Sequence, residues 1–268
     1  MSTRGRGRLG IILLIALAAL GLAFLVLPLL GLLIRAPWHR LPELLSKETS
    51  QQALRLSLVT ASLATALSLL LGVPLAWALA RLELPGRSFF RALVTVPLVL
   101  PPVVGGVALL LAFGRRGIIG GPIYDHTGWS MPFTTTAVVV AETFVAMPFL
   151  VVTVEGALRN ADRRFEEAAA TLGADRLTVL RRVTLPMILP SVVAGAVLTW
   201  ARALGEFGAT ITFAGNFPGR TQTLPLAVYI ELEQDPEAAF ALSIVLLVVS
   251  VAVLVVLRGR WLPGAVSR

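Results

Sequence analysis

Long apolar segments alternate with short arginine-bearing segments along this chain, and this pattern constrains its fold more than any other feature. Only 14% of its 268 residues are charged and 56% are hydrophobic, whereas about 25% are charged in an ordinary soluble domain. About 20 apolar residues in a helix cross the roughly 30 Å hydrocarbon core of a bilayer. The sequence therefore predicts an all-α integral membrane protein with about six transmembrane helices. The six predicted spans are 9–34, 53–80 with an interruption near residues 72–74, 92–113, 133–158, 188–213 and 238–257.

The first apolar segment follows Arg4, Arg6 and Arg8, as the apolar segment of a secretory signal peptide follows basic residues. Its apolar stretch is far longer than the roughly 7–15 residues of a signal peptide. We therefore expect an uncleaved helix over 9–34, preceded by a basic tail over 1–8.

Lys and Arg residues are divided unevenly between the two sides of the predicted membrane. With the N-terminus inside, 15 of the 23 Lys and Arg residues lie in inner segments and 6 in outer ones, while Arg55 and Arg202 fall within spans. Cytoplasmic segments carry this excess in membrane proteins. Both termini and residues 159–187 are therefore expected in the cytoplasm. The net charge of +8 follows from the same bias and does not indicate a nucleic-acid partner.

The chain lacks the residues of several common sites. It has no cysteine, which excludes disulfides and thiolate metal sites. Its two histidines, His39 and His126, both fall in predicted loops, and we expect no metal site. Its only lysine, Lys47, is not part of a Gly-Lys-Ser/Thr phosphate-binding loop. We expect no catalytic residues and no cofactor in this chain, so if ATP drives the protein, another subunit binds it.

Residues 159–187 form an arginine-rich polar loop between two apolar segments. Asp162 is placed to cap a short helix. Glu166 and Glu167 would lie in its first turn, where acidic side chains interact favourably with the helix dipole. Ala168 and Ala169 follow, and alanine is a strong helix former with little bulk.

Gly173 can stop this helix in a left-handed conformation. Asp175 can then cap a second short helix that runs through Arg182 and ends at Pro186. Two short helices joined at a glycine corner would make a compact projection that enters a groove on a partner. The alternative is a plain amphipathic connector that lies on the membrane surface.

The fifth predicted span contains two charges. Arg202 and Glu206 are four residues apart and would share one helix face. Each charge costs at least about 2.5 kcal/mol at the bilayer centre, so the two should pair or face a polar cavity. Arg202, Glu206 and Thr210 are candidates to line or gate a solute pathway; the alternative is an ion pair that only holds the helices together. A stripe of small residues beside the pair would allow close packing: Ala201, Gly205 and Ala209.

The polar loop resembles the signature loop by which permeases of ABC importers dock onto their ATPase. The resemblance rests on Glu167-Ala168-Ala169, on Gly173 four residues later, and on Val183-Thr184-Leu185-Pro186. It implies that the following residues couple the chain to an ATPase: Glu166, Glu167, Ala168, Ala169, Gly173, Leu185 and Pro186.

A second resemblance covers roughly residues 54–229 and is to the permeases of molybdate ABC importers. It rests on the segments 96–106, 114–117, 124–125, 203–210, 213–216, 218–219 and 221–229. Sulfate permeases share Leu-Gly-Glu-Phe-Gly at 204–208, so that element does not identify the anion. Thr-Gln-Thr-Leu-Pro at 221–225 favours molybdate or tungstate. Some members of this family have five helices that begin near Ala53, so the helix over 9–34 is expected to be an additional, peripheral one.

The resemblance implies a multi-pass protein of the cell inner membrane with a core like that of type I ABC importers. It implies a homodimer with one pathway on its two-fold axis, two cytoplasmic ATPase subunits that hold ATP and Mg, and an external oxyanion-binding protein. Membrane lipid would surround the assembly. The expected regions are the tail 1–8, the extra helix 9–34, the core 53–257 with the coupling loop 159–187, and the tail 258–268.

Three arginines in predicted outer loops are candidates for a mouth that attracts anions. They are Arg115, Arg116 and Arg220. The alternative is that they are interfacial arginines whose side chains extend to the membrane surface.

Other functions remain open at this stage. A sulfate permease has the same architecture. A proton-driven transporter with Glu206 as carrier leaves the polar loop unexplained. A membrane-embedded enzyme would use Glu206 and Glu142 as acid and base, although they lie on different predicted spans.

Overall fold

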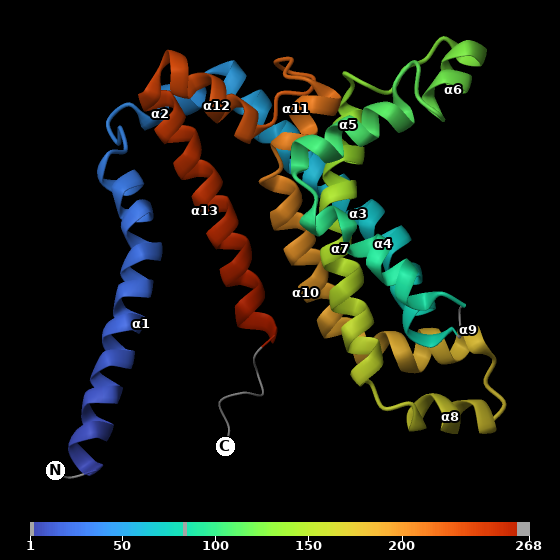
Figure 1. The fold of residues 1–268 in the computed structure, drawn as a ribbon. Coiled ribbons are helices and arrows are strands. Elements are labelled where there is room, and N and C mark those ends of the chain that lie inside the picture. Colours follow the sequence, from blue (N-terminus) through green and yellow to red (C-terminus); the bar gives the residue numbers. More distant parts are fainter. Residues whose placement is uncertain (1–2, 83–84, 262–268) are drawn as a thin grey trace.

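The computed structural model describes residues 3–82 and 85–261, and its elements are helices connected by short loops (Figure 1). Residues 1–2 of the expected basic tail and 262–268 of the expected C-terminal tail lie outside the described residues. In chain order the elements are α1 (Thr3–Ile34), α2 (Leu41–Ser46), α3 (Glu48–Arg81), α4 (Arg87–Val99), α5 (Pro102–Phe113), α6 (Gly120–Thr127), α7 (Thr135–Asn160), α8 (Arg164–Thr171), α9 (Arg176–Val179), the π-helix η1 (Leu180–Thr184), α10 (Leu185–Leu204), α11 (Gly208–Ala214), α12 (Leu224–Gln234) and α13 (Pro236–Trp261).

Five of the described helical segments are long and apolar enough to cross a membrane, and the bent pair α4–α5 makes a sixth if it is one span. This confirms the predicted all-α membrane architecture. The interruption expected near residues 72–74 is wrong. The helix α3 continues from Glu48 to Arg81 with Pro74 inside it, since a long span tolerates one missing backbone donor when neighbouring helices support it.

Three helices form the centre of the bundle: α3, α7 and α10. The face of α3 that meets α7 and α10 carries small side chains, which let the backbones approach closely. A Cβ added at Gly72 would lie 3.2 Å from a methyl group of Val151, which shows how close the contact with α7 is. The buried small residues of α3 include Ala53, Ser57, Thr60, Ala61, Ala64, Ser68 and Ala76.

The predicted third span, 92–113, is not one helix. The helices α4 and α5 meet at an angle of 117°. Leu100 is extended, with φ −66° and ψ 130°, because the residue before a proline is pushed out of the helical region. Pro101 is extended as well, and Pro102 begins α5, where a missing N–H costs nothing.

The predicted fifth span differs at both ends. A continuous helical segment runs from Arg176 to Leu204, so the expected end of the second loop helix at Pro186 is wrong. The π turn of η1 precedes Pro186, and the N–H of Leu185 donates to the carbonyl of Leu180. Pro186 then lies in the first turn of α10 and does not end the helix. At the other end the helix stops at Leu204, and α11 begins at Gly208.

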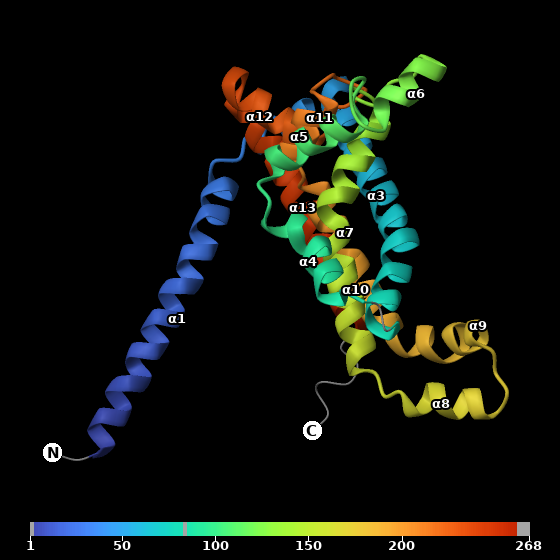
Figure 2. The same cartoon turned by 45° about the vertical axis from the view of Figure 1, so that its right-hand side comes forward.

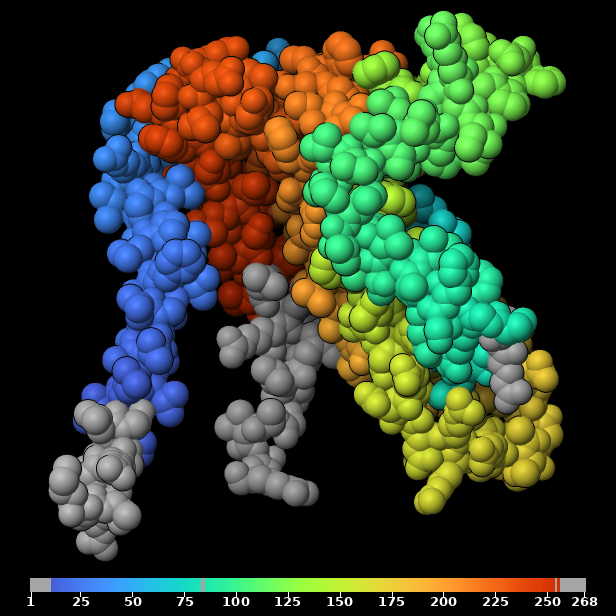
Figure 3. Space-filling model, in the orientation of Figure 1, coloured from blue at the N-terminus to red at the C-terminus, as the bar shows by residue number. Residues whose placement is uncertain are grey.

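The helix α1 stands apart from the bundle along most of its length in both ribbon views (Figures 1 and 2). Residues 11–34 are almost entirely exposed, and the space-filling view shows the described part of α1 as a separate column (Figure 3). This placement agrees with a peripheral helix.

The bundle has two distinct ends (Figure 1). The start of α1, the end of α13 and the helices α8 and α9 lie at one end, which we call the loop end. The helices α2, α6, α11 and α12 lie at the far end.

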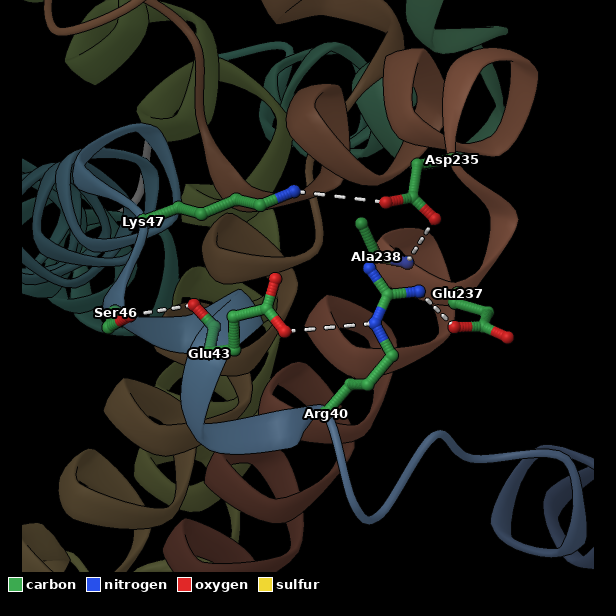
Figure 4. A network of polar contacts seen from close by, with 7 residues as sticks. All are labelled: Arg40, Glu43, Ser46, Lys47, Asp235, Glu237 and Ala238. Carbon is green, nitrogen blue, oxygen red and sulfur yellow. Dashed lines mark hydrogen bonds and ion pairs between the residues drawn. The ribbon is translucent and has the colours of Figure 1, made fainter.

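A charged cluster at the far end fastens α2 to the start of α13 (Figure 4). Arg40 pairs with Glu237 and with Glu43, and Lys47 pairs with Asp235 at 3.7 Å. The hydrogen bond to Glu237 raises the pKa of Arg40. Because these side chains are 31–67% exposed, water screens each pair and each contributes little to stability. Together they set where the chain leaves α1 and enters the bundle.

Candidate functional site: the polar loop and the 205–207 break

The polar loop projects sideways from the loop end of the bundle, and within it α9 lies above α8 in Figure 1. The carboxylate of Asp162 accepts the backbone N–H of Arg164 at 3.0 Å, although the cap position itself is occupied by Arg163. Gly173 has φ +87°, which confirms the left-handed corner. Asp175 caps α9 by accepting the N–H of Thr178 at 3.2 Å, also as predicted.

Glu166 and Glu167 have different surroundings. One Glu166 oxygen accepts from Arg81 Nη2 at 2.8 Å and from the hydroxyl of Thr184 at 3.0 Å. Glu166 therefore ties α8 to the end of α3 and to η1. Glu167 is exposed, so of the two carboxylates it is the one more available to a partner. Arg81 carried no signal in the sequence that linked it to a residue 85 positions away.

An apolar surface on the polar loop is a feature that the sequence reasoning missed. Phe165 is 60% exposed, Leu172 89% and Leu177 52%. Large apolar side chains at this exposure on a projecting loop are typical of an interaction surface. The alanines lie on the same short helix α8, where Ala168 is exposed and Ala169 half-buried. At the base of the loop, Leu185 is half-buried and Pro186 exposed.

The spans next to the polar loop are held together by arginines of α4. Arg87 donates to the last carbonyls of α3, those of Leu79 and Ala80. Arg91 pairs with Glu155 of α7 at 2.5 Å. The Arg81–Glu166 pair links the loop to α3, and the arginines of α4 link α3, α4 and α7 to one another. These are charge-assisted hydrogen bonds, which are stronger than neutral ones.

Residues 205–207 interrupt the helical path between α10 and α11, and the predicted Arg202–Glu206 pair forms beside this break. Arg202 Nη1 lies 2.7 Å from Glu206 Oε2, and the Glu206 side chain is only 1% exposed. The other Glu206 oxygen accepts the N–H of Ala209 at 2.8 Å. Glu206 thus satisfies a free N–H in the first turn of α11 as well as the charge of Arg202. This use of the side chain favours a break over a continuous helix.

Two helix breaks meet at this point. A cavity of about 320 Å³ lies between the α4–α5 bend, through Pro102 and Val103, and the break beyond α10, through Arg202 and residues 205–208. The helices α5 and α11 pack closely here, since a Cβ on Gly106 would lie 2.6 Å from Cβ of Thr212. Two short, tightly packed helices next to interrupted spans are an arrangement that can line a pathway.

Two further buried polar side chains lie near the break. Thr210 is fully buried, and its hydroxyl has no hydrogen-bond partner among the described residues. Glu142 of α7 is buried and accepts from the hydroxyl of Thr60 at 2.9 Å. The fold packs α7 against α11 through Ala141, Val145 and Ala209, so it places the two carboxylates of the enzyme alternative on adjacent elements.

The three candidate mouth arginines lie at the far end. Arg115 lies 5.0 Å from the ring centre of Tyr124 in a cation–π contact. Arg116 follows it on the surface. Arg220 lies in the connection between α11 and α12, where its carbonyl accepts from Thr135.

Several membrane-spanning helices, two interrupted ones beside a cavity and a projecting polar loop with an apolar surface together define a membrane permease. Residues 68–262 match the family described as "Binding-protein-dependent transport system inner membrane component". The match covers more than half of the chain, and the chain belongs to this family. It is therefore a multi-pass, non-catalytic subunit of the inner membrane.

Individual relatives agree with the family. The chain is 50% identical over 251 residues to the molybdenum transport system permease protein ModB of Mycobacterium bovis, covering 94% of this chain and 95% of that one. It is 33% identical over 250 residues to a probable sulfate transport system permease protein of Zygnema circumcarinatum, covering 92% and 86%. The predicted relationship to sulfate permeases is thereby confirmed.

A solved structure supports the fold. A chain of a bacterial alginate ABC transporter, crystallised with an alginate-bound periplasmic protein, superposes with a TM-score of 0.74 over 95% of this chain and 94% of that one. Its sequence identity is 16%, so this likeness supports the fold alone.

Proposed function

We propose that this chain is the permease subunit of an ATP-driven importer for a tetrahedral oxyanion, with molybdate as the first substrate. The observation that carries the proposal is 50% identity, along nearly the whole length of both chains, to a molybdenum transport permease. Identity to the sulfate relative is 33% over a similar span. Tungstate has the same shape and charge as molybdate and is proposed as a second substrate.

The proposed orientation places the loop end in the cytoplasm. The start of α1, the end of α13 and the polar loop all lie at that end (Figure 1). The same segments carry most of the arginines, as the positive-inside bias requires. ATP and Mg are then held by a cytoplasmic partner that the polar loop can reach.

The ATPase would dock on the polar loop. In this proposal, Phe165 and Leu172 supply the apolar contact, and Ala168 and Ala169 let the partner approach α8 closely. Glu167 supplies an exposed carboxylate. Gly173, Leu185 and Pro186 shape the corner and the base of the loop. Glu166 would not contact the partner. Because it pairs with Arg81, a displacement of α8 would be transmitted to α3.

The pathway is proposed to run past the 205–207 break. The Arg202–Glu206 pair joins the last turn of α10 to the break, and Thr210 lies in the first turn of α11. The cavity beside them opens between two interrupted spans. A permease must hold its ion weakly enough to release it. A charge pair that is already neutralised fits that requirement better than an isolated arginine does. Arg115, Arg116 and Arg220 would raise the anion concentration at the far end.

The working assembly is proposed to be a homodimer with two ATPase subunits and an external oxyanion-binding protein, surrounded by membrane lipid. The core over 53–257 would form the pathway with its second copy on a two-fold axis. The helix over 9–34 would stay peripheral, since α1 stands apart from the bundle along most of its length (Figure 2).

The test is anion uptake into proteoliposomes that contain this chain, its ATPase and ATP, with the binding protein added outside. The proposal predicts molybdate uptake that requires both ATP and the binding protein. Sulfate should inhibit this uptake only weakly. Uptake without ATP, driven by a pH gradient, would instead support the proton-driven alternative. Sulfate uptake at the same rate would keep the architecture and change the substrate, an outcome that the sulfate relative makes the second candidate.

A further inference from the structure

The polar loop contains a cavity of about 360 Å³ that no role described above uses. Its walls come from the end of α3, through Trp77 and Arg81, from α8, and from α9 and η1. The helices α8 and α9 face each other across this region in Figure 2. The cavity therefore lies where the loop meets a span.

Arg81 is the buried cation of this cavity. Its side chain is 8% exposed, and its Nη2 donates to Glu166 at 2.8 Å. Its Nε and Nη1 are buried and have no acceptor among the described residues. A guanidinium carries five N–H donors, and a buried donor without an acceptor is unfavourable. Residues 3–82 and 85–261 thus offer Arg81 no further acceptor at this point.

The charges around the cavity favour an anion. Three guanidinium groups line it, those of Arg81, Arg163 and Arg176. Two carboxylates also line it, those of Glu166 and Glu167. One Glu166 oxygen accepts from Arg81 Nη2 and from Thr184, and Nε and Nη1 of Arg81 form no hydrogen bond with this carboxylate. Among the described residues that line the cavity, arginines outnumber glutamates by three to two, and the buried groups without a partner are donors.

We propose that this cavity binds a small tetrahedral oxyanion, with Arg81 as the principal ligand and Arg163 and Arg176 closing over it. Such an ion offers several acceptor oxygens to guanidinium donors, a pairing that is strong and directional. Its position on the cytoplasmic side rests on the proposed function. An ion here joins α3 to the polar loop, so its occupancy would change how firmly the loop is held to the span. Inorganic phosphate and the transported anion share this chemistry.

The experiment is isothermal titration of the purified full chain in detergent with sodium phosphate, sulfate and molybdate, each against chloride of matched ionic strength. Arg81→Lys keeps a cation for Glu166 but removes the guanidinium donors, and we expect its affinity to fall about tenfold or more. Arg163→Gln changes an exposed side chain that cannot disturb the core, and its affinity should fall as well. Arg164→Gln, the neighbouring exposed arginine that does not line the cavity, should bind like the parent.

The site is supported by saturable binding whose affinity falls in Arg81→Lys and Arg163→Gln and is unchanged in Arg164→Gln. Preference for molybdate would identify the transported ion as the ligand, and equal affinities would identify the general oxyanion pool; both support the proposal. No saturable binding, or equal affinity in all four proteins, overturns it. Such a failure is separable from the transport proposal, because ATP-dependent uptake by the parent chain is measured independently.

Discussion

Replacement of Glu206 tests how the 205–207 break is stabilised. Glu206 is 1% exposed and serves Arg202 with one oxygen and the N–H of Ala209 with the other. Glu206→Gln keeps an oxygen for Ala209 but removes the charge. Glu206→Ala removes both contacts and leaves a buried N–H without an acceptor. The two variants therefore separate the ion pair from the capping of α11.

The expected magnitudes follow from these contacts. A hydrogen bond to a charged group contributes about 1.5–3 kcal/mol, and an unsatisfied buried N–H costs about 1–3 kcal/mol. Arg202 is 29% exposed, so water replaces part of the lost contact and the lower end of the first range applies. We expect losses of about 1.5 kcal/mol for Gln and about 3.5 kcal/mol for Ala. At about 2–4 °C per kcal/mol for a chain of this size, Tm should fall by about 3–6 °C and about 7–14 °C.

The assay is thermal unfolding in detergent, followed by the fluorescence of the five tryptophans. Arg202→Gln is the matched control. It leaves a buried carboxylate without its cation and should cost more than Glu206→Gln does. Equal falls in Tm for Glu206→Gln and Glu206→Ala would refute the capping role. In reconstituted complexes, Glu206→Gln should assemble normally while its uptake changes; unaltered uptake would leave Glu206 a structural residue.

Three further predictions concern single positions. Gly173→Asp should fold but lose ATP-coupled uptake, because φ +87° costs a residue with a side chain about 1–2 kcal/mol and because the variant adds a charge to the docking surface. Gly173→Asn adds a side chain without the charge and should retain more uptake. Normal uptake by the Asp variant would contradict the docking role. Gly106→Ala should lower Tm by the equivalent of about 1–3 kcal/mol, because its Cβ meets Thr212 and Ala209, whereas Gly156→Ala has open space and should not. Hydrogen bonds from Thr178 lower the pKa of Asp175 in the folded protein. The contribution of this cap to stability is therefore present above the unfolded pKa of about 3.9 and is lost as the pH falls through the lower folded pKa. Hydrogen exchange of residues 176–179 should accelerate in that pH range in the parent but not in Asp175→Asn.

The membrane spans could be predicted because the length of an apolar segment is a direct physical requirement of the bilayer. Gly173 and Asp175 could be predicted because a left-handed corner and an N-cap are local properties. The bend at Leu100 was predictable as well, since Pro101 restricts the residue before it, but apolar composition alone merged α4 and α5 into one span.

Other features depend on contacts that no local pattern contains. The break after Leu204 depends on the Glu206 side chain, which accepts the backbone N–H of Ala209 in place of a helical carbonyl. The helix that passes through Pro186 depends on a π turn in η1. The Arg81–Glu166 pair joins residues 85 positions apart, and only the packed bundle brings them together. The inward role of Glu166 and the apolar surface of the polar loop were missed for this reason.

The most direct test of the central claim is substrate-stimulated ATP hydrolysis by this chain reconstituted with its ATPase and oxyanion-binding protein. Our account predicts that molybdate or tungstate, delivered by the binding protein, stimulates hydrolysis and that sulfate does so weakly. It also predicts that Gly173→Asp abolishes the stimulation while the ATPase alone keeps its basal rate. Failure of any ATPase to associate with the chain, or hydrolysis that ignores the anion, would contradict the account.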